Sequence, residues 1–253
     1  MRMLGSCLKS PLLARAVAVL PVLVSGIGFT GASAQTPQAR FSGRITNGDG
    51  GPVPSAVVVL CNEDVDLWSI TSTDDAGAFD LTELPANEFS VEVLSPLWRR
   101  PNTGQVWGFR PWTGSISLQS GQNLKRDIRL GDAARQPLAP KTPPPCSPSR
   151  PFAMVGSERL ARLLIHQTTP VYPQSVKDVN SEVQVTLEAF MNKDGKVISL
   201  RLLAPSWPPK VDPVLTRAAV ETVRDWRYSP PQPVSGEVFE FTGKIVVDFA
   251  RDR

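Results

Sequence analysis

The sequence is poor in the residues on which catalysis and metal binding most often depend. It contains one histidine, His166, and three cysteines among 253 residues. A serine–histidine–acid triad needs a histidine beside its nucleophile, and a zinc site needs several closely spaced histidine or cysteine ligands. A glycine-rich phosphate loop is also missing from the sequence. We therefore expect no catalytic residue, no metal and no cofactor, and we interpret His166 as an ordinary residue at a helix end.

Net charge is nearly absent once the first 34 residues are set aside. The whole chain has a formal charge of +3, from 27 basic and 24 acidic residues. Three of the basic residues and none of the acidic ones lie within residues 1–34, so the remainder carries 24 of each sign. A chain without net charge offers no broad basic surface for phosphates. We expect neither nucleic acid nor anionic lipid as a partner.

A hydrophobic run long enough to cross a membrane is missing as well. Residues 16–29 form an apolar stretch of about fourteen residues, whereas a spanning helix needs roughly 20. This stretch follows a basic segment and precedes Ala32-Ser33-Ala34, an arrangement typical of a secretory signal peptide. We predict a signal peptide at 1–34, cleavage between Ala34 and Gln35, and a location in the periplasm or cell envelope. An uncleaved anchor in the inner membrane is the alternative.

Export would place the chain in an oxidising compartment, where disulfides persist. Cys61 and Cys146 remain after the signal peptide is removed. Either these two cysteines form one disulfide that ties the linker to the first domain, or Cys61 is a core residue and Cys146 is unpaired. The sequence leaves this choice open.

Residues 41–130 have the pattern of an all-β domain. Short strand-forming segments recur at roughly ten-residue spacing and are separated by Gly, Pro and Asp turns. The segment from Val57 to Cys61 is apolar at every position, which indicates a strand buried on both faces. The pattern predicts a β-sandwich, with strands at 41–45, 57–61, 69–73, 78–81, 89–94, 116–118 and 124–130.

The first half of this region resembles the carboxypeptidase regulatory-like domain. The motifs that carry the resemblance are Ser42-Gly43-Arg44-Ile45, Gly51-Pro52-Val53-Pro54-Ser55-Ala56, Asp75-Ala76-Gly77-Ala78-Phe79 and Leu84-Pro85. The resemblance covers about residues 41–95 and implies a small transthyretin-like sandwich that is not itself catalytic. The sequence departs from the family at Pro85-Ala86-Asn87, where the family usually has Pro-Pro-Gly.

An aromatic segment follows, with Trp98, Trp107, Phe109 and Trp112 close to three arginines. Exposed Trp and Arg side chains would form a binding patch for a glycan or the cell wall. Alternatively, the aromatic side chains fold back over one end of the sandwich, which is the interpretation we favour.

Residues 131–151 predict a Pro-rich linker. Seven prolines lie between Pro137 and Pro151, and such a run favours an extended, semi-rigid spacer. We expect this spacer to separate two domains that need not pack against each other.

Residues 157–250 predict an α+β domain. A short amphipathic helix is expected at 157–166, and alternating strands at 183–190, 198–202 and 239–249. A helix begins at Asp212-Pro213, an N-cap residue followed by a first-turn proline. It should bury Leu215, Ala219 and Trp226 and expose Arg217 and Glu221.

The expected order is therefore β-β-α-β, a three-stranded antiparallel sheet with one helix. A right-handed crossover through the helix places the third strand parallel to the second. The first strand is then central, and the third strand lies at an edge of the sheet. Gly243 in that strand marks a bulge or a flat position.

The same region resembles the C-terminal domain of TonB over about residues 165–250. The matching motifs are Tyr172-Pro173, Asp194-Gly195-Lys196-Val197, Trp226-Arg227-Tyr228-Ser229-Pro230 and Val246-Val247-Asp248-Phe249. We assign Tyr172, Pro173, Gly195, Trp226 and Pro230 to the family motif and core. The sequence departs from the family at Ser181-Glu182, and at the Trp207 loop before the helix.

The resemblance implies capture of an extended peptide by strand addition, as a TonB C-terminal domain pairs with a short segment of an outer-membrane receptor. Exposed backbone groups on an edge strand are suited to such pairing. The partner-binding residues expected on the last strand are Phe241, Lys244, Ile245, Val246, Val247 and Phe249. Alternatively, dimerisation or a neighbouring loop protects this edge.

The function expected from these observations is that of a non-catalytic envelope protein that binds a protein partner in TonB-related transport. A membrane-anchored energy transducer is the first alternative. Binding of a glycan or the cell wall by the sandwich is the second.

Overall fold

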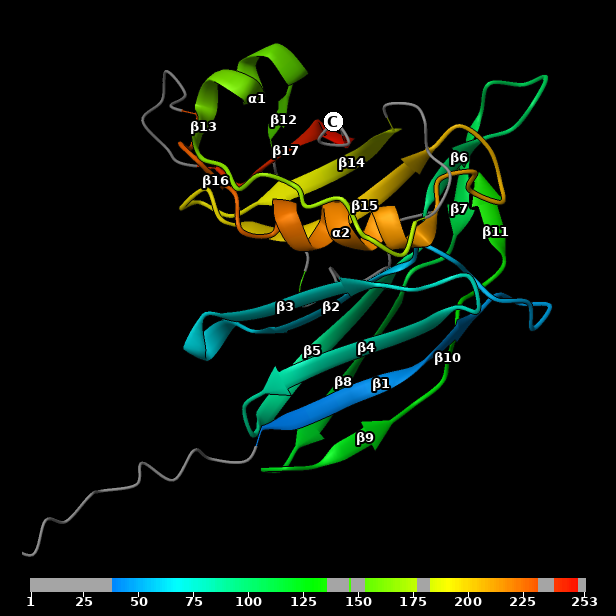
Figure 1. Cartoon of the computed structure of the whole chain (residues 1–253), viewed down its shortest axis with the longest axis vertical. Coiled ribbons are helices and arrows are strands. Elements are labelled where there is room, and N and C mark those ends of the chain that lie inside the picture. The colour runs from blue at the N-terminus through cyan, green and yellow to red at the C-terminus, as the bar shows by residue number, and fades with distance from the viewer. Residues whose placement is uncertain (1–37, 136–145, 147–152, 177–182, 232–238, 250–253) are drawn as a thin grey trace, which may run out of the picture. The chain divides into compact units, whose positions relative to one another are not determined.

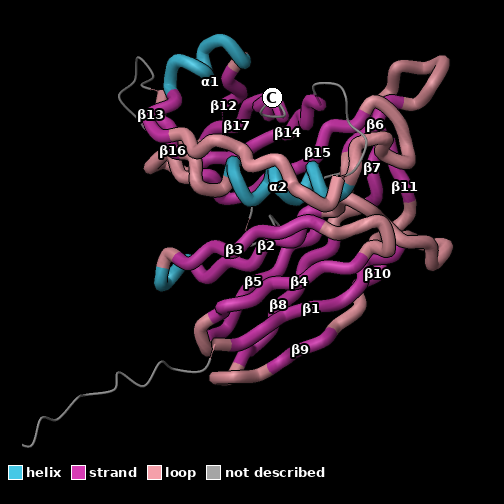
Figure 2. The backbone as a smooth tube through the Cα atoms, viewed as in Figure 1, coloured by secondary structure: helices cyan, strands magenta, loops and turns pink. Residues whose placement is uncertain are grey.

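A computed structural model describes residues 38–135, 146, 153–176, 183–231 and 239–249. The predicted cleavage site at Ala34 and Gln35 and most of the Pro-rich linker lie outside the described residues. The described part is mostly β-sheet, with two α-helices and one 3-10 turn, Glu63–Val65 (Figures 1 and 2). The chain thus has the composition expected of an all-β domain followed by an α+β domain.

The N-terminal domain consists of two sheets that enclose an apolar core. In the first sheet β1 pairs antiparallel with β4 on one side and parallel with β9 and β10 on the other. Its strands are β1 (Ala39–Thr46), β4 (Ala78–Leu84), β9 (Asn123–Lys125) and β10 (Ile128–Arg129). The second sheet is antiparallel, in the order β3-β2-β5-β8. Its strands are β2 (Val57–Asn62), β3 (Leu67–Ser72), β5 (Asn87–Leu94) and β8 (Trp112–Leu118).

The C-terminal domain places its first strand at the centre of the sheet. β14 (Val183–Met191) pairs antiparallel with β15 (Val197–Ala204) on one side and with β17 (Phe241–Phe249) on the other. The crossover helix α2 (Pro213–Val223) begins where the Asp212 carboxylate accepts a 2.8 Å hydrogen bond from the Val214 N–H. Trp226 is 5% exposed, so the sheet covers the aromatic residue that a short helix cannot bury alone.

This sheet has seven strands and not the three that were expected. Its order is β11-β7-β6-β15-β14-β17-β12. The added strands are β6 (Leu97–Arg99), β7 (Val106–Phe109), β11 (Ala133–Arg135) and β12 (Ala153–Val155). β11 lies inside the region predicted as a spacer, so that prediction is wrong for residues 133–135. Three of the added strands come from the chain around the sandwich, so one sheet joins the two domains.

The remaining elements lie at the C-terminal domain's periphery. Helix α1 (Ser157–Leu163) ends three residues before the predicted end at 166, because the chain continues as β13 (Leu164–His166), which pairs with β16 (Arg227–Tyr228). His166 is therefore an exposed strand residue and not a helix-end residue.

The aromatic segment divides between the two domains: Trp98 and Phe109 pack against Trp207 of the C-terminal domain, whereas the Trp112 ring lies over its own sandwich strand β8. The Trp98 ring lies 5.0 Å from that of Trp207, which precedes α2, and 5.3 Å from that of Phe109. Trp98 is 7% exposed, so it presents no face to a glycan. The Arg100 guanidinium lies 3.6 Å from the Trp107 ring centroid, a cation–π contact that covers this second ring.

Helix α2 contacts the sandwich along β3 as well as its own sheet (Figure 1). The Thr216 side chain is fully buried and lies 3.2 Å from the Ser55 hydroxyl. Arg217 donates two hydrogen bonds, of 3.1 and 2.9 Å, to the carbonyl oxygen of Ser72. The expected solvent face is therefore wrong for Arg217, whose guanidinium bonds to β3, whereas Glu221 is exposed as expected.

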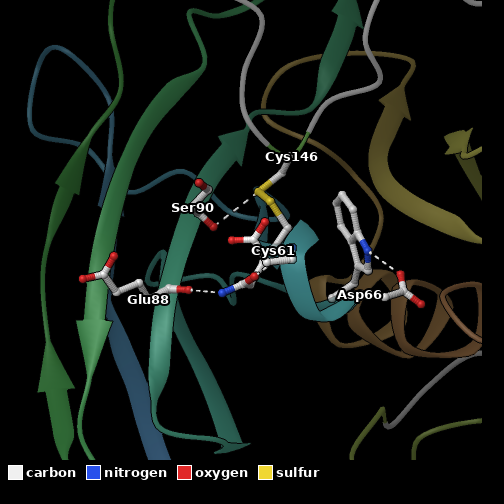
Figure 3. Close-up of a disulfide and its surroundings, with 8 residues drawn as sticks. Cys61, Asp66, Glu88, Ser90 and Cys146 are labelled. Carbon is white, nitrogen blue, oxygen red and sulfur yellow. Dashed lines mark hydrogen bonds between the residues drawn. A yellow bond between two sulfur atoms is a disulfide. The ribbon is translucent and has the colours of Figure 1, made fainter.

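Cys61 and Cys146 form a disulfide, with their Cα atoms 5.6 Å apart (Figure 3). The Cys146 sulfur lies 3.3 Å from the carbonyl oxygen of Ser90 on the neighbouring strand β5. Both cysteines are buried. Together with the packing of the C-terminal domain, this bond explains why β2 is buried on both faces.

Candidate functional site

The inner side of β17 is completely paired. All nine of its residues align with β14, from Phe241 opposite Met191 to Phe249 opposite Val183, without a register shift. Side chains alternate along the strand, and Ile245, Val247 and Phe249 are buried. These three residues, proposed from the sequence as partner contacts, instead hold β17 in the core through their side chains.

The outer side of β17 is partly covered by the protein itself. β12 pairs with it in parallel, with Ala153 opposite Phe241 and Val155 opposite Gly243. The Ala153 N–H donates a 2.9 Å hydrogen bond to the carbonyl oxygen of Glu240. Phe241 must therefore be removed from the predicted partner-binding residues. β12 therefore protects the beginning of this edge, as in the alternative of a neighbouring segment that was inferred from the sequence.

Gly243 allows this cover to approach and does not form the bulge considered earlier. It pairs regularly with Ala189. A Cβ atom at this position would lie 2.7 Å from a methyl carbon of Leu160 in α1 and 3.0 Å from the carbonyl oxygen of Val155. The missing side chain therefore makes room for both α1 and β12.

Beyond Gly243 the outer side has no strand beside it among the described residues. The Glu240 carbonyl points outward to β12, and backbone direction alternates along a strand. The N–H and C=O groups of Lys244, Val246 and Asp248 therefore point outward too. All three side chains are exposed, and Val246 is 41% exposed. Residues 244–249 thus form a short free edge with an apolar side chain between two charges.

Of the motif residues, Tyr172 contacts this strand directly. The Tyr172 ring lies 6.3 Å from that of Phe249 in an edge-to-face contact. Trp226 donates a 3.1 Å hydrogen bond from its indole N–H to the carbonyl oxygen of Thr168. Pro173 and Pro230 are partly buried. These residues hold the domain together, and none of them extends the free edge.

Gly195 is required by the backbone. Its φ is +76°, and an added Cβ atom would overlap the carbonyl oxygen of Tyr228. The Tyr228 N–H donates a 2.9 Å hydrogen bond to the Gly195 carbonyl. Tyr228 is 2% exposed, and burial raises the pKa of its phenol above the ordinary value. The motif glycine and tyrosine thus form one tight contact.

Sequence reasoning missed β12 as part of this site. Ala153-Met154-Val155 is only three residues long, which is too short for an alternating pattern to predict a strand.

In the described part of the chain, no group of three or more acidic, histidine or cysteine residues could hold a metal ion. A helix able to cross a membrane was likewise not found in that part.

Two domain models match the sequence. The carboxypeptidase regulatory-like domain matches residues 40–131, and the Gram-negative bacterial TonB protein C-terminal domain matches residues 168–250. Both resemblances inferred from the motifs are confirmed, in the predicted order. A search of curated proteins gave no match.

Solved structures show only distant similarity. The major pilin subunit BcpA of Bacillus cereus is 13% identical with a TM-score of 0.31, over 38% of this chain and 30% of the pilin. A putative carbohydrate binding protein from Pseudomonas aeruginosa is 16% identical with a TM-score of 0.28, over 39% of this chain and 92% of that protein. The Bacillus anthracis TIE protein is 12% identical with a TM-score of 0.30, over 84% of this chain and 34% of that protein. The chain spans about a third of the length of the pilin and of the TIE protein.

Proposed function

We propose that this chain, which carries a carboxypeptidase regulatory-like domain before a TonB C-terminal domain, is a TonB-related envelope protein that binds a protein partner by strand pairing. The partner would supply an extended segment, as from an outer-membrane receptor, that adds to residues 244–249 of β17. The protein would be non-catalytic and would act in TonB-related transport. In this proposal the β-β-α-β unit holds the receiving strand.

The free edge beyond Gly243 is the observation that carries the proposal. The register of β12 directs the Lys244 N–H at the Val155 carbonyl. The Lys244 carbonyl and the N–H and C=O groups of Val246 and Asp248 therefore provide the donors and acceptors for a segment of roughly three to six residues. β12 covers only the first three residues of β17. An incoming strand would therefore continue the line of β12 along the same side.

Val246→Pro tests this contact without breaking the domain. Its N–H points away from β14, so a proline there removes one donor from the free edge and leaves the inner ladder intact. The matched control is Val246→Ala, which shortens the same side chain and keeps the N–H group. We expect Val246→Pro to weaken partner capture about tenfold or more, which corresponds to about 1.4 kcal/mol.

The measurement is crosslinking in native envelopes from a photoreactive amino acid at Lys244, followed by identification of the crosslinked peptide. Crosslinks to an outer-membrane receptor segment that disappear with Val246→Pro support the proposal. Crosslinks only to a second copy of the chain would show a homodimer instead. Unchanged capture by a folded Val246→Pro protein would contradict strand pairing.

N-terminal sequencing of the mature protein distinguishes the adaptor from the energy transducer. A chain that begins at Gln35 is released from the membrane and acts as a periplasmic adaptor. A chain that retains residues 1–34 is anchored in the inner membrane, as a transducer requires.

A further inference from the structure

A groove of about 550 Å³ lies between the two domains. Its walls are β3, β4, the end of α2 and the residues that begin β15. This volume falls within the range of roughly 300–1,000 Å³ that is usual for ligand sites. The groove is separate from the free edge of β17, because no residue of β17 lines it.

One wall of the groove is the open edge of a sheet. β3 is the last strand in the order β3-β2-β5-β8. The Ser72 carbonyl points away from β2, because it accepts hydrogen bonds from Arg217. Backbone direction alternates along a strand, so Ile70 and Trp68 direct their N–H and C=O groups to the same outer side.

The opposite wall is a second open edge. β4 is the last strand in the order β10-β1-β4. The Ala78 carbonyl points away from β1, since it accepts a 2.9 Å hydrogen bond from the Asp74 N–H. By alternation, the backbone groups of Asp80 point outward as well. The groove is thus bounded by two strand edges that converge near Asp74 and Ala78, where the Arg217 guanidinium donates to the carbonyl oxygens of both Ser72 and Ala78.

A bulge in β4 is located at this groove. The pairing of β4 with β1 shifts register between Leu81 and Leu84, and Glu83 within the shift has a φ of 59°. A left-handed conformation is unfavourable for a glutamate, and bulges of this kind redirect a side chain. Here the bulge contributes Glu83 to the groove lining.

The charged side chains of the lining differ in whether they have a counter-ion. Lys196 forms an ion pair with Asp66 at 3.0 Å, which lowers the pKa of that carboxyl, and Arg224 lies 3.7 Å from Asp225. Asp80 is paired with Arg40 at 2.6 Å. Among the described residues, no ion pair is found for Glu83 or for Glu221 on α2. Arg227 also has no ion pair there, but its guanidinium donates to the carbonyl oxygens of Arg224 and Trp226.

We propose that this groove binds an extended peptide segment of a partner protein that carries a lysine or arginine. The segment would pair its backbone with the outer edge of β3 or β4. Its basic side chain would lie at the carboxylates of Glu83 and Glu221, with the ring of Trp68 along the same wall as an aromatic surface for the cation. This site is independent of strand pairing at β17, and it gives the protein a second place for peptide capture.

Peptide display tests the proposal with a defined probe. A phage-displayed library of random peptides of about nine residues, the length of a strand, is selected against the purified protein. We expect the selected peptides to contain lysine or arginine. Their affinity should fall roughly tenfold or more in the double variant Glu83→Gln/Glu221→Gln, which keeps side-chain size and removes both charges.

The matched control is Asp49→Asn/Glu88→Gln, which removes two exposed carboxylates outside the groove and should leave the affinity unchanged. Val246→Pro should also leave it unchanged, which separates this site from the free edge of β17. Hydrogen exchange provides a readout of pairing, because a bound strand should slow exchange at the Ile70 or Asp80 amide. The proposal is overturned if no peptide is selected, if affinity is insensitive to the groove variant, or if neither amide gains protection.

Discussion

At the residue scale, Arg201 on β15 is a basic residue that lies near two carboxylates, those of Glu188 and Glu92. Glu92, on β5 of the sandwich, is 1% exposed. Burial lowers the pKa of the Arg201 guanidinium on β15, and the carboxylates of Glu188 and Glu92 oppose that shift. A buried charge is tolerated only when an opposite charge compensates for its desolvation. Glu188 on β14 supplies one compensating charge from the same domain, and Glu92 adds a second from the sandwich.

Replacing Glu92 should therefore cost more stability than its polarity suggests. We expect Glu92→Gln to lower the free energy of unfolding by roughly 3 kcal/mol, because Arg201 loses a compensating charge. The control Glu88→Gln removes an exposed carboxylate from the same strand and should change stability by about 0.5 kcal/mol or less. Urea unfolding measures both. Equal effects of the two substitutions would contradict the proposed coupling.

Alanine substitutions at Gly195 and Gly50 distinguish the cost of an unfavourable backbone conformation from the cost of a steric overlap. Both have positive φ, +76° and +83°, but a Cβ atom would overlap Tyr228 at Gly195 and meets no atom within 4 Å at Gly50. We expect Gly50→Ala to cost about 1 kcal/mol from backbone conformation alone. Gly195→Ala should cost roughly 3 kcal/mol or more, since the Tyr228 backbone must move. Thermal unfolding of the two variants compares them, and equal melting temperatures would show that the overlap is relieved freely.

At the scale of elements, α2 shows where periodicity predicts a structure and where it does not. Its spacing of apolar residues predicted the helix and its buried face, and Leu215, Ala219 and Val223 are buried. The same pattern placed Arg217 in solvent, whereas this side chain bonds to β3. A helix between two layers has two covered sides, and a polar side chain can face either backbone carbonyls or water. The sequence does not distinguish these environments.

Arg217 and Arg224 provide a test on the same helix. Arg217→Ala should lower the free energy of unfolding by roughly 1.5–3 kcal/mol, because the hydrogen bonds to the Ser72 carbonyl involve a charged donor. Arg224→Ala removes an exposed ion pair with Asp225 and should cost at most about 1 kcal/mol. Urea unfolding monitored by tryptophan fluorescence gives both values. A larger loss for Arg224→Ala would contradict the interface role of Arg217.

For the whole molecule, the disulfide and the shared sheet connect parts of the chain that the sequence suggested were separate. The bond between Cys61 and Cys146 links positions 85 residues apart. We expect Cys61→Ser/Cys146→Ser to lower the free energy of unfolding by roughly 4 kcal/mol, by restoring freedom to the unfolded chain. The measurement is unfolding in denaturant without reductant. As a control, reductant should destabilise the unsubstituted protein by a similar amount and leave the stability of the double variant unchanged. Equal stability of the unsubstituted protein with and without reductant would contradict this account.

The sequence determined the elements and the identity of the domains. Alternation and turn residues are local properties of the chain, so strands at 183–190 and 198–202, the helix after Asp212 and most of the sandwich strands were predicted from them, and the observed strands extend these two to 191 and to 197–204. The motifs around Tyr172, Gly195 and Trp226 identified the C-terminal domain for the same reason. The placement of the last strand next to the first followed from the handedness of the crossover.

Only the tertiary structure decided which surfaces meet. The covering of the first part of β17 by Ala153–Val155, the packing of Trp98 on Trp207 and the pairing of Cys61 with Cys146 all join segments distant in sequence. Such contacts depend on how two folded surfaces fit, and no local pattern encodes that fit. The extent of the free edge, residues 244–249, is therefore a property of the folded molecule, although the strand that carries it was evident from the sequence.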